Sequence, residues 1–99
     1  MAKFVQVIEY QTSKFDEMQK ATDAYRAATE GRRTVGRVVV GADRDRPGTY
    51  LTIAEFPSYE EAMRNNDLPE TAELAGKMQA LADGPPTFRN LDVEQIEEF

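Results

Sequence analysis

A few polar side chains interrupt stretches that are otherwise apolar, and their chemistry could serve a reaction. Arg37 is the charge within the segment TVGRVVVG, where a guanidinium could hold a carboxylate or an oxyanion. Glu55 stands near the end of the next apolar segment and would act as a general base if it were desolvated. The Asn65 amide could hydrogen-bond a phenol or enolate oxygen and stabilise developing charge. We therefore predict Asn65 and Arg37 as catalytic residues.

Aromatic residues supply further candidates for contact with a ligand, as an apolar wall or as phenol groups. The predicted substrate-binding set is Phe56, Glu55, Tyr50, Tyr10 and Tyr25. Each candidate also has a structural alternative. Aromatic residues in strands and helices ordinarily pack in a core, and Asn65 could simply end a helix. Arg37 and Glu55 could form a salt bridge between paired strands.

The composition excludes several kinds of chemistry. The 99 residues contain no histidine and no cysteine, which removes the usual metal and haem ligands, thiolate zinc, iron–sulfur clusters and cysteine nucleophiles. We therefore expect no cofactor and no metal. The net charge of −6 argues against nucleic acid or an anionic membrane surface as a partner. The lack of cysteine and of a long apolar run fits a cytoplasmic protein without a membrane span.

The candidate residues must be positioned by strands and helices that the sequence pattern predicts. Residues rich in β-branched and aromatic types predict strands over 3–10, 34–41, 49–56 and 87–93. Apolar residues at three- and four-residue spacing predict a helix that Ser13 caps and Gly31 ends. Ser58 caps a second helix, which is interrupted at residues 65–67 and restarts at Pro69. The length fits a single domain over residues 1–99.

The order of these elements predicts an α+β fold of ferredoxin-like βαββαβ type, a four-stranded antiparallel sheet with helices on one face. Both faces of the sheet carry apolar residues, since Val38 and Val40 alternate with Val39 in the second strand. Two helices cover only one face, so we expect a second copy to cover the other and close a dimeric α+β barrel. The alternative is a monomer whose sheet stays partly wet.

The segment from Ile53 to Pro69 resembles the antibiotic biosynthesis monooxygenase superfamily of dimeric α+β barrels. Members of that superfamily carry a strand ending in Glu-Trp, a helix cap rich in Ser and Glu, a Glu-Ala pair, and a His followed by Ser-Pro. At the matching positions this chain has Glu55-Phe56, Ser58, Glu61-Ala62, Asn65 and Leu68-Pro69. The order of strands and helices extends the resemblance over nearly the whole chain.

The resemblance implies a reaction without a cofactor. Haem-degrading members depend on the His and the Trp, whose places Asn65 and Phe56 take here, and this argues against haem. Quinone-forming members use neither metal nor flavin, and they hold an electron-rich phenol that itself activates oxygen in a polar pocket between sheet and helices. The resemblance thus implies that a homodimer oxidises or isomerises an aromatic or polyketide-like small molecule.

Two other classes of function share this order of elements. A non-catalytic dimeric module, which binds a small ligand or accompanies another enzyme, stays open because the sequence shows no reaction. RNA-binding RRM domains are disfavoured, because the third strand TYLTIAEF lacks their basic-glycine-aromatic run and the net charge is negative. A part-polar cavity between sheet and helices would favour ligand chemistry over a purely structural role.

Overall fold

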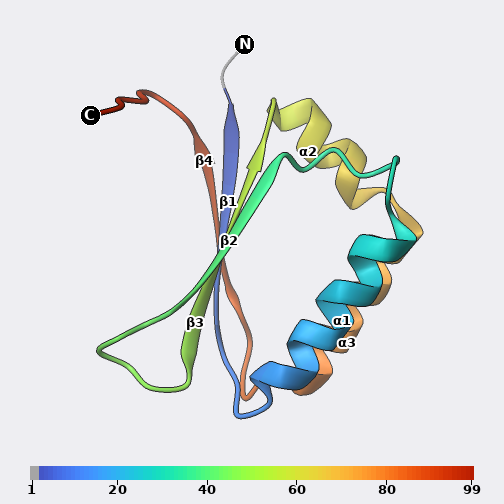
Figure 1. Ribbon diagram of the computed structural model, residues 1–99, viewed down its shortest axis with the longest axis vertical. Coiled ribbons are helices and arrows are strands. Elements are labelled where there is room, and N and C mark those ends of the chain that lie inside the picture. The colour runs from blue at the N-terminus through green and yellow to red at the C-terminus, as the bar shows by residue number, and fades with distance from the viewer. Residues whose placement is uncertain (1–2) are drawn as a thin grey trace.

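The computed structural model describes residues 3–99, which form four strands and three helices (Figure 1). In chain order these are β1 (Phe4–Gln11), α1 (Phe15–Ala28), β2 (Arg37–Ala42), β3 (Thr49–Phe56), α2 (Tyr59–Asn66), α3 (Pro69–Leu81) and β4 (Thr87–Asp92). The interruption expected at residues 65–67 lies slightly later, at residues 67–68, because α2 continues to Asn66 before α3 begins. Pro69 begins α3, because proline has no N–H that a first helical residue would leave unbonded.

The four strands described form an antiparallel sheet in the order β2-β3-β1-β4, and the helices stand on one side of it (Figure 1). The predicted ferredoxin-like α+β arrangement is therefore confirmed. β2 begins at Arg37 rather than at residue 34, because Thr34 bonds to α2 and not to a strand. The Thr34 N–H donates to Asn65 Oδ1 at 3.0 Å, and its hydroxyl donates to the Glu61 carbonyl at 2.5 Å.

The two ends of α1 differ slightly from the prediction. The helix begins after Lys14, and Thr12 organises the turn in place of the expected Ser13 cap. Thr12 Oγ1 accepts from the Lys14 N–H at 2.9 Å and donates to the Leu81 carbonyl at 2.7 Å, so it ties the start of α1 to the end of α3. Gly31 lies beyond the helix with φ +80°, a conformation that favours glycine.

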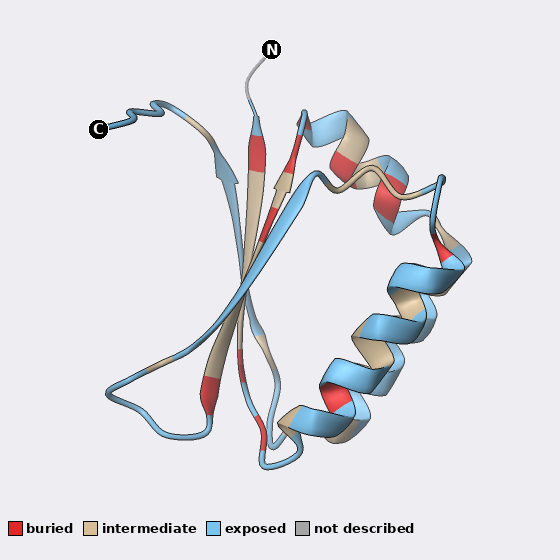
Figure 2. Ribbon diagram, in the orientation of Figure 1, coloured by how far each residue is buried: buried red, intermediate tan, exposed pale blue. Residues whose placement is uncertain are grey.

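Within the sheet, the buried residues lie near its two ends (Figure 2). The cluster beside α2 consists of Phe4, Ala54, Phe56 and Ala62. Ser58 fixes α2 there by accepting from the Glu61 N–H at 3.2 Å, as the sequence predicts. At the other end Tyr50 stacks on Phe15, with ring centroids 4.2 Å apart, and lies 6.0 Å from Tyr10. These two clusters join the helix layer to the sheet.

No helix within residues 3–99 combines the length and the apolar character that crossing a membrane requires.

Candidate functional site

Every second residue of each strand points toward the helices. Strand register places Gln6 beside Ala54 on one neighbouring strand and beside Asn90 on the other. We call the middle of this helix-facing surface the central surface. Its residues are Val38, Ala54, Gln6 and Asn90 in one row, and Val40, Thr52, Ile8 and Phe88 in the next. Amide and hydroxyl groups stand among apolar side chains in both rows.

Solvent reaches most of the central surface although the helices stand over it, and of its eight residues only Ala54 is buried. Gln6, Ile8 and Thr52 lie on the two inner strands and are only half-buried. On the outer strands Val40 is 38% exposed and Phe88 is 55% exposed. None of the 13 residues of α3 is buried. The helices therefore pack on the sheet near its two ends and leave the middle of the sheet accessible to solvent. A ligand bound there would contact both apolar and polar groups.

Two hydrogen-bonded pairs supply the polar groups beside this accessible region. Gln6 Nε2 donates to Asn90 Oδ1 at 3.1 Å, and Thr52 Oγ1 donates to the Tyr10 hydroxyl at 3.3 Å. Tyr10 itself is buried, and its ring packs with Tyr50 at the edge of the central surface. Tyr10 and Tyr50 therefore lie at the edge of the central surface, and their contact with a ligand stays a prediction.

Asn65 is 6% exposed and lies at the junction of α2 and α3. Its Oδ1 accepts from the Thr34 N–H and its Nδ2 donates to the Tyr25 hydroxyl at 3.1 Å, so these partners fix the orientation of the amide. Thr71 Oγ1 donates to the Asn65 backbone carbonyl at 2.8 Å. Because that uses the only hydroxyl hydrogen of Thr71, the Tyr25 hydroxyl donates to Thr71 Oγ1 at 2.9 Å.

We call Asn65, Tyr25 and Thr71 the Asn65 ring, because three hydrogen bonds lead from Asn65 to Tyr25, from Tyr25 to Thr71 and from Thr71 back to Asn65. With Thr34 it joins α1, the α2-α3 junction and the segment that leads into β2. The ring uses the Tyr25 hydroxyl twice and one of the two Nδ2 hydrogens of Asn65. The structural role is thus visible, whereas the catalytic role of Asn65 and the ligand contact of Tyr25 stay predictions.

Arg37 and Glu55 lie on the face of the sheet turned away from the helices. They are register partners, and each alternates with residues of the central surface. Arg37 Nε lies 3.2 Å from Glu55 Oε2, so the cross-strand salt bridge that the sequence allows is present. Phe56 does face the helices, but it packs in the core with its ring centroid 6.3 Å from that of Phe4.

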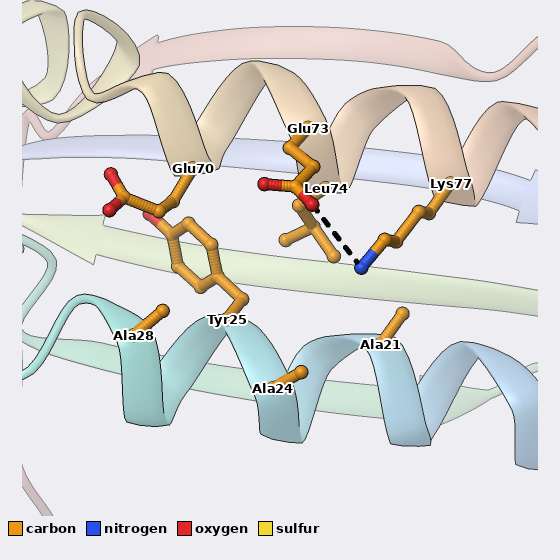
Figure 3. Close-up of a pocket in the computed structure, with 8 residues that line it drawn as sticks. All are labelled: Ala21, Ala24, Tyr25, Ala28, Glu70, Glu73, Leu74 and Lys77. Atoms are coloured by element: carbon orange, nitrogen blue, oxygen red, sulfur yellow. Dashed lines mark ion pairs between the residues drawn. The ribbon is translucent and has the colours of Figure 1, made fainter.

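Two hollows lie outside the central surface. A groove of about 130 Å³ runs between α1 and α3, with Tyr25 and Leu74 among its lining residues (Figure 3). At this groove the hydrogen bond from Arg32 lowers the pKa of the Glu70 carboxyl. A second hollow, of about 320 Å³, lies where β1 ends and includes Tyr10. Among the described residues no group of three or more His, Cys, Asp or Glu could hold a metal ion.

Sequence reasoning missed several residues of this region. Gln6, Thr52 and Asn90 were not candidates, although alternation puts Gln6 on the same strand face as Ile8 and Tyr10. A polar residue on an apolar strand face is the signal that could have found them. Thr71 could not be found in this way, because its contact with Tyr25 depends on how α1 and α3 pack.

Three solved structures with the same fold show what the chain is similar to. No protein-family model and no curated protein matches the sequence. SnoaB, a cofactor-independent oxygenase from Streptomyces nogalater, superimposes with a TM-score of 0.80 at 15% identity, over 97% of each chain. An antibiotic biosynthesis monooxygenase gives 0.73 at 13% identity, over 93% of this chain and 99% of the other. A conserved protein from Methanosarcina mazei Go1 gives 0.80 at 12%, over 93% of each.

These similarities cover nearly the full length of both chains in each pair. At 12–15% identity they establish a shared fold and not a shared function, because one fold can host many functions. The resemblance to the antibiotic biosynthesis monooxygenase superfamily is therefore confirmed at the level of the fold.

Proposed function

We propose that this chain, which has the fold of antibiotic biosynthesis monooxygenases, is a homodimeric cytoplasmic oxygenase that needs no cofactor. Its substrate would be an electron-rich aromatic or polyketide-like small molecule bound on the central surface. The observation that carries this proposal is the half-burial of Gln6, Ile8 and Thr52 on the sheet face beneath the helices. The helices pack closely against the sheet only near its two ends. The similarity in fold to SnoaB, a cofactor-independent oxygenase, supports it.

In this proposal the substrate supplies the electrons and the protein supplies the surroundings. A ring CH₂ group gives up two hydrogens, one atom of O₂ becomes a carbonyl oxygen on that carbon, and the other leaves as water. Ile8, Val40 and Phe88 would hold the flat ring, and amide or hydroxyl donors would stabilise the phenolate that reacts with oxygen. Asn65 would take part through its second Nδ2 hydrogen.

The dimer proposal rests on the opposite face of the sheet. Its apolar residues adjoin one another across the four strands: Val5, Val7, Val39, Leu51, Ile53 and Leu91. We call these six the outer patch. Val39 is 43% and Leu91 48% exposed, and no helix within residues 3–99 covers this side (Figure 1). Arg37–Glu55 at 3.2 Å and Arg89–Glu9 at 3.6 Å flank the patch, and an apolar centre with a charged rim is typical of protein interfaces.

Oxygen uptake with dithranol as the substrate tests the proposed activity. We expect the wild-type protein to accelerate uptake over buffer, with one O₂ consumed for each quinone formed. Asn65→Ala should slow the reaction, and Arg37→Ala should leave it unchanged because Arg37 lies on the other face. A rate equal to that of buffer would contradict the proposal.

The other candidate function is a module that binds a small ligand without transforming it. It is favoured by the lack of a carboxylate or an imidazole among the eight described residues of the central surface. Binding of dithranol with no oxygen uptake would select this alternative over the oxygenase.

A further inference from the structure

We propose that the Gln6–Asn90 amide pair is the specificity-determining element of the central surface and selects ligands that carry a hydroxyl and a carbonyl group side by side. The inference rests on the proposed function, because it concerns a ligand bound at that same surface. It adds the chemical groups that the ligand presents and the two residues that recognise them.

The pair is placed by sheet register. Gln6 lies on the inner strand β1, and Asn90 is its direct partner on the outer strand β4, so both amides point to the helix side. Gln6 is half-buried and Asn90 is exposed, which means that a ligand entering from the β4 side can reach both. Ile8 and Phe88 form the adjacent cross-strand pair and offer an apolar surface next to the amides.

Counting donors and acceptors gives the class of ligand. The bond from Gln6 Nε2 to Asn90 Oδ1 uses one hydrogen and one acceptor, and leaves Gln6 Oε1 and the Asn90 NH₂ group without a partner among residues 3–99. If both amides are turned over, Asn90 donates to Gln6, and again one carbonyl oxygen and one NH₂ group remain. In either orientation the pair offers one acceptor beside donors, which complements a hydroxyl next to a carbonyl.

The lack of charged side chains beside the amide pair would also determine which ligands bind. The four residues of this row, Val38, Ala54, Gln6 and Asn90, include no charged side chain. A carboxylate or phosphate would find no cationic partner in this row, so neutral oxygen groups are favoured. The hydroxyls of Thr52 and Tyr10 mark the next polar position, roughly 7 Å along the strands, since each residue rises about 3.4 Å. A fused aromatic ligand would lie between the two polar positions.

Two probes with the same ring skeleton test the proposal. Dithranol has a carbonyl flanked by hydroxyls, and anthrone has the carbonyl alone. Dissociation constants are measured without oxygen from the change in ligand absorbance, for the wild type, Gln6→Leu and Asn90→Leu. We expect the wild type to bind dithranol at least fivefold more tightly than anthrone, about the value of one hydrogen bond. Each variant should bring this ratio close to one.

Gln19→Leu is the matched control, because it makes the same chemical change at an exposed position of α1 and should keep the wild-type ratio. If Gln6→Leu fails to fold, Asn90→Ala on the outer strand provides the second variant. An unchanged ratio in the folded variants, equal binding of both probes by the wild type, or binding of neither would overturn the inference.

Oxygen uptake measured in parallel separates this inference from the proposed function. Selective, amide-dependent binding without oxygen uptake would reject the oxygenase and retain the amide pair as a ligand selector. Oxygen uptake with an unchanged preference between the probes would do the reverse.

Discussion

The two faces of the sheet are made by the same four strands and yet differ in what they offer a partner. The face toward the helices mixes amide, hydroxyl and apolar groups and carries no charge in its two middle rows. The outer face collects the outer patch and the ion pairs Arg37–Glu55 and Glu9–Arg89. Neutral polar groups suit a small uncharged ligand, whereas an apolar centre with a charged rim suits a second protein surface.

If the proposed function is correct, each strand contacts a ligand with one face and a second copy with the other. Successive side chains point to opposite faces, so that Ile53 and Thr52 are neighbours in sequence but meet different surroundings. A substitution should therefore affect assembly or ligand binding according to the face of the sheet on which the side chain lies.

The largest effect is expected from a charge in the middle of the outer patch. Ile53→Glu should weaken self-association at least a thousandfold, because a carboxylate buried without a partner costs several kcal/mol. Sedimentation equilibrium measures the dissociation constant. Val38→Glu places the same charge on the helix-facing side of β2 and serves as the control that keeps the dimer. Equal loss of association in both variants would break the distinction between the faces.

A smaller effect, on stability, is expected at the Asn65 ring, which joins α1, the α2-α3 junction and the segment that leads into β2. Asn65→Ala leaves the Thr34 N–H and the Tyr25 hydroxyl without their partner, and should lower the free energy of unfolding by about 2–3 kcal/mol. Urea denaturation measures the change. Asn66→Ala, at the exposed neighbour, should cost well under 1 kcal/mol. If the two losses are alike, the hydrogen bonds of the ring do not contribute to stability as proposed.

Filling the space over the central surface should act on the ligand and not on assembly. Val40→Trp places a large ring on the helix-facing side of β2 and should lower the dithranol oxidation rate roughly tenfold, since excluding a ligand by about 1.4 kcal/mol has that effect. Oxygen uptake gives the rate and sedimentation gives the oligomeric state. Gln19→Trp, an exposed position of α1, provides the control. Unaltered turnover by a folded Val40→Trp protein would place the reaction elsewhere.

The smallest effect is expected at the salt bridge on the outer face. The Arg37 side chain is 70% exposed, so Arg37→Ala should lower the free energy of unfolding by less than about 1 kcal/mol and leave oxygen uptake intact. Thermal denaturation and the oxygen electrode measure the two quantities. A large loss of activity with little loss of stability would restore Arg37 to the catalytic site.

The fold could be read largely from the sequence, because it depends on local patterns. The third strand ends at Phe56 as expected, and Ser58 and Pro69 begin the helices that their types predict. The start of α1 was missed because Thr12, rather than Ser13, bonds both to the turn and to the end of α3. That choice depends on tertiary packing, which a local pattern does not contain.

The candidate site was predicted less well, because its groups meet through pairing and packing. Sequence alone marked Arg37 and Glu55 as unusual charges and allowed their salt bridge, but only the placement of the helices shows that both lie on the face turned away from the central surface. The Gln6–Asn90 bond joins residues 84 positions apart, and only the β1–β4 register brings them together. A neutral polar residue on an otherwise apolar strand face therefore indicates a candidate site as much as a charged residue does.

The different roles proposed for the two faces of the sheet require that a second copy of the chain covers the outer patch. Sedimentation velocity on the wild-type protein at micromolar concentration measures this directly. A folded species of about twice the 11.2 kDa subunit mass is the predicted result. A stable, fully folded species of 11.2 kDa at that concentration would contradict it.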